Sequence, residues 1–179
     1  MKVLTGERSA MTLSAAEFTA LYHQTRGTVR RFVRRRVMTA EHMEDICADV
    51  FELAYRKLPA DHPHPIGWLI RAAGILIAKT ARLSERERVA LRDHVVVYGD
   101  DADDPRLREL DAAWAALPER HREVLRLTIW DGLSAAEAAI VLGCTEQAAW
   151  QRVSRARAAL RAAWPSNDLE EGAEVRIYG

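Results

Sequence analysis

Side chains that can bind nucleic acid are concentrated on one predicted helix in the last third of the chain. Glutamine and arginine make paired hydrogen bonds to adenine and guanine edges, and arginine also binds phosphate. We therefore predict a site for duplex nucleic acid on this helix. Its candidate residues are Thr145, Gln147, Trp150, Gln151, Arg152, Ser154 and Arg155.

Local signals between Gly132 and Leu160 predict that this helix is the second of a helix-turn-helix. Ser134 and Glu137 have the S-x-x-E spacing of a capping box, Gly143 can end the first helix, and Thr145 can cap the second. A narrow apolar stripe follows at Ala149, Val153, Ala156 and Leu160. A recognition helix in the major groove has this pattern. An arginine-rich solvated helix that closes a small bundle has it too, and spacing alone does not separate the two.

Four carboxylates form a second group, on a helix predicted over about Ala40 to Leu58. At 100° per residue they fall within about 80° of arc, opposite the apolar positions. They are Glu41, Asp45, Asp49 and Glu52. A solvated face, a carboxylate metal or acid–base site, and a docking surface for a basic partner all fit. A metal site would need histidines or further carboxylates from a facing helix, which the sequence does not offer, so the residues favour the solvated face and then docking.

A tryptophan within a basic stripe forms the third group, on a helix predicted from about Ile66 to past Arg88. The proline-rich segment Pro59 to Gly67 precedes it and is predicted to be a loop. The stripe consists of Trp68, Arg71, Lys79, Arg82 and Arg86. A tryptophan beside cations can stack on an unpaired base. It can equally be a core residue near the start of the helix, and the residues alone favour the core.

The remaining elements are also predicted to be helical. One helix covers about Ser14 to Val37, and its last turns, RRFVRRR, place cations where they suit either the helix dipole or a nucleic-acid backbone. Two more helices cover about Leu110 to Ala116 and Pro118 to Trp130. The acidic stretch between the two helical regions lacks a helical period. We predict an all-α fold of two small helical domains joined by a flexible acidic linker.

Composition limits the function classes. The 179 residues carry 26 basic and 26 acidic side chains, but basic residues prevail in 17–92 and 112–163, and acidic residues in 93–111 and 164–179. No apolar run approaches the ~20 residues of a membrane span and no leader is visible, so we expect no membrane insertion and a cytoplasmic location.

Cys47 and Cys144 lack metal-ligand spacing and are expected to be reduced packing residues. No nucleophile–base set or phosphate loop is found, so we expect neither an enzyme nor a cofactor.

The order and spacing of these segments resemble an extracytoplasmic-function (ECF) sigma factor of the sigma-70 superfamily (group IV), which serves bacterial RNA polymerase. The segments that carry the resemblance are AEHMEDICADVFELAYRKL, PIGWLIRAAGILIAKTARLSERER and LPERHREVLRLTIWDGLSAAEAAIVLGCTEQAAWQRVSRARAAL. The resemblance implies sigma domain two over residues 14–89, a linker over 90–109, sigma domain four over 110–164 and an acidic tail over 165–179.

The resemblance also implies a function, which is to bind core RNA polymerase and direct promoter recognition and transcription initiation. The carboxylate row would dock on the β′ clamp helices, the Trp68 stripe would open and read the minus-ten element, and the helix-turn-helix would read the minus-thirty-five element. The implied partners are core polymerase (β′ clamp helices and β flap), promoter DNA and, as a further candidate, an anti-sigma factor. A helix-turn-helix regulator that binds operators without polymerase is the alternative.

The sequence departs from the family pattern at several of these positions. Gly74 replaces a usual Asn and Lys79 a usual Asp. The usual Gly-Thr-Val-Lys run of the recognition helix is Gln147, Ala148, Ala149 and Trp150. Ala148 removes one expected phosphate contact, and Trp150 replaces a cation with an apolar surface. The family resemblance therefore predicts the fold and the general role of this sequence better than it predicts which bases the recognition helix prefers.

Overall fold

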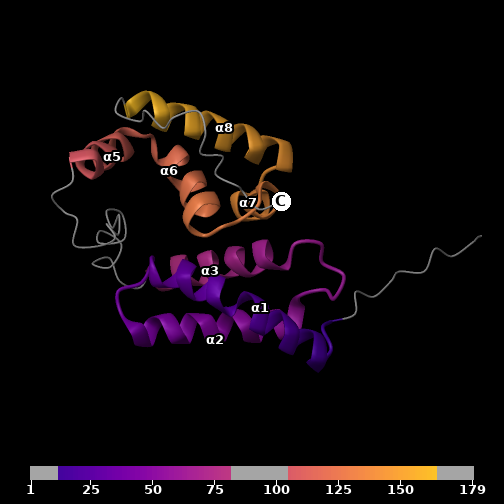
Figure 1. Ribbon diagram of the computed structural model, residues 1–179. Helices are drawn as coiled ribbons and strands as arrows, with labels where there is room; N and C mark the ends of the chain where they lie inside the picture. The colour runs from indigo at the N-terminus through magenta and orange to yellow at the C-terminus, as the bar shows by residue number, and fades with distance from the viewer. Residues whose placement is uncertain (1–11, 82–104, 165–179) are drawn as a thin grey trace, which may run out of the picture. The chain divides into compact units, whose positions relative to one another are not determined.

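The computed structural model describes residues 12–81 and 105–164, and these residues are almost entirely helical (Figure 1). The elements are α1 (Ala15–Arg34), α2 (Ala40–Lys57), α3 (Pro65–Ala81), α5 (Pro105–Ala116), α6 (Glu119–Leu125), the π-helical segment η1 (Arg126–Trp130), α7 (Ala135–Leu142) and α8 (Glu146–Ala163). Within the described ranges, extended pairing is limited to one bridge between Thr12 and Pro59. The predicted all-α class is confirmed. The chain divides into two compact units, Met1–Leu91 and Arg92–Gly179.

In the first unit, α1, α2 and α3 pack against one another as a three-helix bundle (Figure 1). Two local caps fix where its first helices begin. The Ser14 backbone N–H donates to the Glu17 carboxylate at 2.8 Å, and the Glu17 N–H donates back to the Ser14 hydroxyl at 3.3 Å. Thr39 caps α2 by accepting from the His42 N–H at 3.2 Å. The reciprocal pair at Ser14 and Glu17 is a capping box.

The most deeply buried side chains in the core of this bundle are aliphatic. Those with 0% exposed surface are Val29, Val33, Val50, Ala54, Leu69, Ile70 and Ala73. A single apolar stripe through Leu69 and Ala73 would leave out Ile70 and Ala72, yet both of these are buried as well. Because α3 packs against both α1 and α2, it buries a wider arc than a single apolar stripe.

In the second unit, α8 packs against α5, α6 and α7. Its core cluster consists of Trp114, Leu117, Val124, Leu125 and Ala156, with Trp130, Leu142, Val153 and Leu160 against its edge. The Trp114 and Trp130 rings meet edge to face with 4.4 Å between their centroids. This geometry is favourable for aromatic pairs and fixes α5 against the end of the α6–η1 helix.

The helix predicted from Pro118 to Trp130 changes its winding before it ends. Over Arg126–Trp130 it is π-helical, and the Asp131 N–H donates to the Arg126 carbonyl, five residues back, at 3.0 Å. The wider turn buries Leu127, exposes Ile129 and keeps Trp130 against Trp114. The prediction of one uninterrupted helix was wrong in this respect, because π-helical turns are set by packing rather than by local sequence.

One further boundary differs from the sequence prediction. Helix α5 begins at Pro105, so the last five residues of the segment predicted as linker, 105–109, are helical. Proline is well suited to the first position of a helix because its missing N–H would be unpaired there in any case. Residues 82–104, with the predicted end of the third helix and most of the predicted linker, lie outside the described residues, as does the tail after Trp164.

Candidate nucleic-acid interface

The helix-turn-helix consists of α7, the turn at Gly143–Thr145, and α8, and each of its predicted caps is present. The Glu137 N–H donates to the Ser134 hydroxyl at 3.3 Å, and the Ser134 N–H donates to the Glu137 carboxylate at 2.8 Å. Gly143 ends α7 with φ +63°, a left-handed conformation that glycine adopts without a steric penalty. Thr145 accepts from the Ala148 N–H at 3.2 Å and begins α8. The Thr145 oxygen is therefore already used by the helix, although its O–H can still donate.

The inner side of α8 rests on small side chains. Ala149 and Ala156 have no exposed surface, and Val153 and Leu160 pack against the core cluster. Methyl side chains at these two contacts let the backbone of α8 approach the supporting helices closely. The predicted apolar stripe is confirmed, and it fixes which side of α8 faces outward.

The outward side of α8 carries the predicted nucleic-acid residues. Gln147, Trp150, Gln151, Arg152, Ser154 and Arg155 are all exposed. Neither Arg152 nor Arg155 has an ion-pair partner among the residues that the structure describes. Their charges are therefore available to phosphates, and short polar side chains between them leave room for base edges. That this face contacts DNA stays a prediction.

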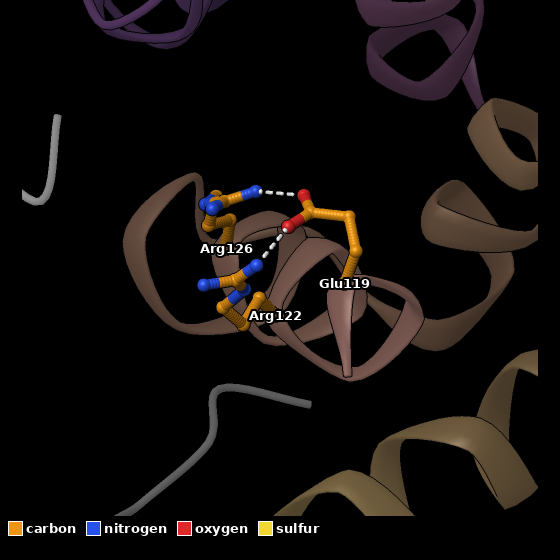
Figure 2. A network of polar contacts seen from close by, with 3 residues as sticks. All are labelled: Glu119, Arg122 and Arg126. Atoms are coloured by element: carbon orange, nitrogen blue, oxygen red, sulfur yellow. Dashed lines mark hydrogen bonds and ion pairs between the residues drawn. The ribbon is translucent and has the colours of Figure 1, made fainter. Parts of the chain in front are cut away.

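A group of charged side chains, which we call the buttress, links α6 to the π-helical segment; it consists of Glu119, Arg122 and Arg126. One Glu119 carboxylate oxygen lies 2.7 Å from the Arg126 guanidinium and the other lies 2.8 Å from Arg122 (Figure 2). The Arg126 guanidinium also lies 5.8 Å from the centre of the Trp114 ring. Burial opposes ionisation of Glu119, but the hydrogen bonds and charges of Arg126 and Arg122 outweigh it and hold the pKa of this carboxyl below 4.5.

Replacing Glu119 with Gln should destabilise the second unit in a pH-dependent way. Because the folded pKa is lowered, the carboxylate stabilises the fold at neutral pH, and this contribution is lost as pH falls through the folded pKa. At pH 7 we expect Glu119→Gln to reduce the free energy of unfolding by ~0.2–1 kcal/mol, the range for solvent-exposed pairs. The difference from the parent should shrink toward pH 3. Urea unfolding followed by tryptophan fluorescence measures both.

Glu123→Gln provides the control for that experiment. Glu123 is an exposed carboxylate on the same helix, and it has no ion-pair partner among the described residues. This variant should unfold like the parent at both pH values. Equal urea-unfolding curves for Glu119→Gln and Glu123→Gln at pH 7 would show that the buttress contributes nothing to stability.

In the first unit, the carboxylate row lies along α2 on the side opposite the buried Met43 and Val50. Its members Glu41, Asp45, Asp49 and Glu52 are all exposed. Glu52 pairs with Arg56 at 2.7 Å within the same helix, whereas Asp45 and Asp49 have no ion-pair partner among the described residues. The middle of the row is therefore a patch of uncompensated negative charge. No group of three or more metal-ligating side chains is found in the described parts of the chain.

The outward side of α3 carries part of the predicted basic stripe. Trp68 is half-buried, Arg71 and Lys79 are exposed, and Arg82 and Arg86 lie outside the described residues. Ile75, with 60% of its surface exposed, lies on the same arc and was not singled out from the sequence. Counting 100° per residue from Trp68 would have found it. An exposed isoleucine between two cations adds an apolar surface to this side of the helix.

The loop before α3 is held by its own histidines. The His64 N–H donates to Nδ1 of His62 at 3.1 Å. Burial and the neighbouring His64 lower the pKa of His62, which favours the neutral ring that accepts this bond. The loop therefore delivers the chain to Pro65 in a defined conformation, and Trp68 follows in the first turn of α3.

Comparisons with known proteins point to one family. Residues 107–160 match the family model "Sigma-70, region 4". The ECF RNA polymerase sigma factor SigF of Caulobacter vibrioides (strain NA1000 / CB15N) is 42% identical over 86 residues, 48% of this chain and 48% of that protein. The chain thus matches about half the length of this curated relative.

Two solved structures resemble the whole described fold. The structure of CnrH in complex with the cytosolic domain of CnrY is 25% identical, with a TM-score of 0.53 over 84% of this chain and 88% of that chain. The sigma factor RpoE in complex with the anti-sigma factor NepR from Bartonella quintana is 20% identical, with a TM-score of 0.55 over 86% and 99%, and shows the fold alone.

The capped helix-turn-helix lies within the segment that matches sigma-70 region 4, and the two solved structures share the helical fold. None of the described helices is long and apolar enough to cross a membrane.

Proposed function

We propose that this protein is a sigma factor that binds core RNA polymerase in the cytoplasm and directs promoter recognition and transcription initiation. The observation that carries the proposal is the outward side of α8, where Arg152 and Arg155 lack described ion-pair partners within the segment that matches sigma-70 region 4. The protein supplies binding and recognition, and the polymerase supplies the catalytic step.

The proposal assigns a role to each candidate surface. The outward side of α8 reads the minus-thirty-five element, while the Trp68 stripe, including Arg82 and Arg86, binds the opened minus-ten strand. The carboxylate row docks on the β′ clamp helices, and the second unit contacts the β flap. Residues 14–89 and 110–164 act as sigma domains two and four, joined by the linker 90–109. RpoE was solved with an anti-sigma factor, so we propose such a protein as a further candidate partner here.

Gel filtration with core polymerase tests this function directly. The full chain should co-elute with core, and the resulting holoenzyme should start transcripts at defined positions on genomic promoter fragments. A chain that binds specific DNA alone and leaves core unbound would instead be an operator-binding regulator. That outcome would show that the protein is not a sigma factor.

Removing one cation from α8 should change how promoter binding depends on salt. If Arg155 neutralises a phosphate, Arg155→Ala should weaken holoenzyme binding evenly across promoter sequences and reduce the slope of log K against log salt by about one. If it contacts a base, the loss should be ~1–3 kcal/mol at one position of the site. Arg152→Ala follows the same logic. Fluorescence anisotropy over a salt series distinguishes the two cases.

Arg120→Ala is the matched control, because Arg120 is an exposed arginine of the same unit that lies on α6. Its slope should match that of the parent. Should Arg152→Ala and Arg155→Ala both bind promoters as the parent does, the recognition surface does not include these two arginines.

A further inference from the structure

An exposed tryptophan stands at the amino end of the recognition helix. With 66% of its surface exposed, Trp150 is the most exposed large hydrophobic residue in the described parts of the chain. It is the fifth residue of α8 and takes no part in the core cluster that holds the helix in place. Its indole ring is therefore available to a partner, and the first turns of a recognition helix are where base edges are contacted.

The surroundings of Trp150 are polar but carry no positive charge toward the outward side. Its neighbours one turn away on that side are Gln147 and Ser154, both exposed and uncharged. Arg152 and Arg155 lie further round the helix by the 100° count. The indole ring is thus an apolar group beside uncharged hydrogen-bonding side chains, and the two arginines lie further from it around the helix.

Duplex DNA offers one kind of apolar group to such a spot. In the major groove, every base pair presents donors and acceptors, but only thymine adds a methyl group, at C5. The bases of a closed duplex are already stacked, so the flat ring cannot stack on them as it could on an unpaired base. The indole N–H is a single donor and cannot accept, so it makes no paired contact to a base edge.

We propose that Trp150 is a specificity-determining residue that packs on the 5-methyl group of thymine in the duplex bound by α8. The inference rests on the proposed function and deepens it, since it names the chemical group that the recognition helix reads. A charge contact to phosphate is blind to sequence, whereas an apolar contact to a methyl group depends on the base.

Replacing thymine with deoxyuridine tests the inference, because it removes the methyl group and leaves every hydrogen-bonding group unchanged. Holoenzyme made from the full chain and core polymerase is first used to select its preferred upstream duplexes from a random pool. Each thymine of the selected element is then replaced singly by deoxyuridine, and the dissociation constants are compared. For the parent we expect about fourfold weaker binding at one or two positions, the effect of losing one buried methyl-sized group.

Trp150→Ala should abolish that discrimination, so that thymine and deoxyuridine duplexes bind equally. Ile129→Ala, which truncates an exposed apolar residue of the same unit outside α8, should retain it. Circular dichroism establishes that both variants fold.

Three results would overturn the inference while leaving the sigma-factor function in place. They are selected elements without thymine, equal binding of thymine and deoxyuridine duplexes by the parent, and undiminished discrimination by Trp150→Ala. A parent chain that does not bind core polymerase would instead remove the proposed function, and this inference with it.

Discussion

Charge reversal at Asp49 should weaken binding to core polymerase by about 100-fold or more. A like charge placed at a docking surface costs several kcal/mol, and each 1.4 kcal/mol corresponds to about a tenfold change in the dissociation constant. Asp49 lies within the uncompensated part of the carboxylate row, on the side of α2 opposite the buried Val50 and Ala54. A substitution there leaves the packing of the bundle intact, because exposed positions usually change stability by under ~0.5 kcal/mol.

A titration of fluorescently labelled chain with core polymerase measures this effect, with circular dichroism to establish folding. Asp45→Arg should behave like Asp49→Arg. Glu52→Arg should have a smaller effect, since Glu52 is already paired with Arg56. Asp61→Arg, in the loop between α2 and α3, is the control and should bind as the parent does. If all three row variants fold and bind core normally, the docking surface lies elsewhere.

Trp68→Ala should impair promoter opening more than the initial binding of the closed promoter. Stacking of an aromatic ring on an unpaired base contributes ~1–3 kcal/mol, so the ratio of open to closed complexes should fall by up to about 100-fold. Permanganate reactivity of the minus-ten thymines measures the opening, and filter binding at low temperature measures the closed complex.

Because Trp68 is half-buried, a loss of opening in Trp68→Ala could come from lost stacking on a base or from lost packing in the bundle. Two further substitutions distinguish these causes. Trp68→Phe keeps an aromatic face, whereas Trp68→Leu keeps apolar volume without one. A stacking role predicts that Phe supports opening and Leu does not. If Leu opens promoters as well as Phe, or if Trp68→Ala merely unfolds at lower temperature with normal opening, Trp68 is a core residue.

The caps of the helices could be predicted from sequence because each is a contact between neighbours in the chain. Ser134 and Glu137 are three residues apart, and a hydroxyl with a carboxylate at that spacing closes a capping box in almost any context. Gly143 is similar, since the left-handed end of α7 favours a residue without a Cβ. The outward side of α8 could be predicted in the same way, because the apolar residues of this helix recur at the helical period and so identify its buried side.

Features that depend on distant partners could not be predicted in this way. The π-helical turn exists where Trp130 meets Trp114, and nothing within Arg126–Trp130 announces it. The contact between Glu119 and Arg126 spans seven residues, across the junction between α6 and that turn, and so exceeds the i+3 and i+4 spacings at which charged side chains of a helix usually pair. On α3, contact with two neighbouring helices widened the buried arc to include Ile70. In each case tertiary packing decided the outcome.

The two buried alanines on the inner side of α8 have a consequence for how this protein can diverge. Ala149 and Ala156 carry the packing of the recognition helix, and the exposed residues of its outward side do not share in it. Because the two sets of residues barely overlap, the outer positions are free to change with little loss of stability. The chemical groups that this side presents, the Trp150 ring among them, can therefore be exchanged one substitution at a time while the helix stays in place.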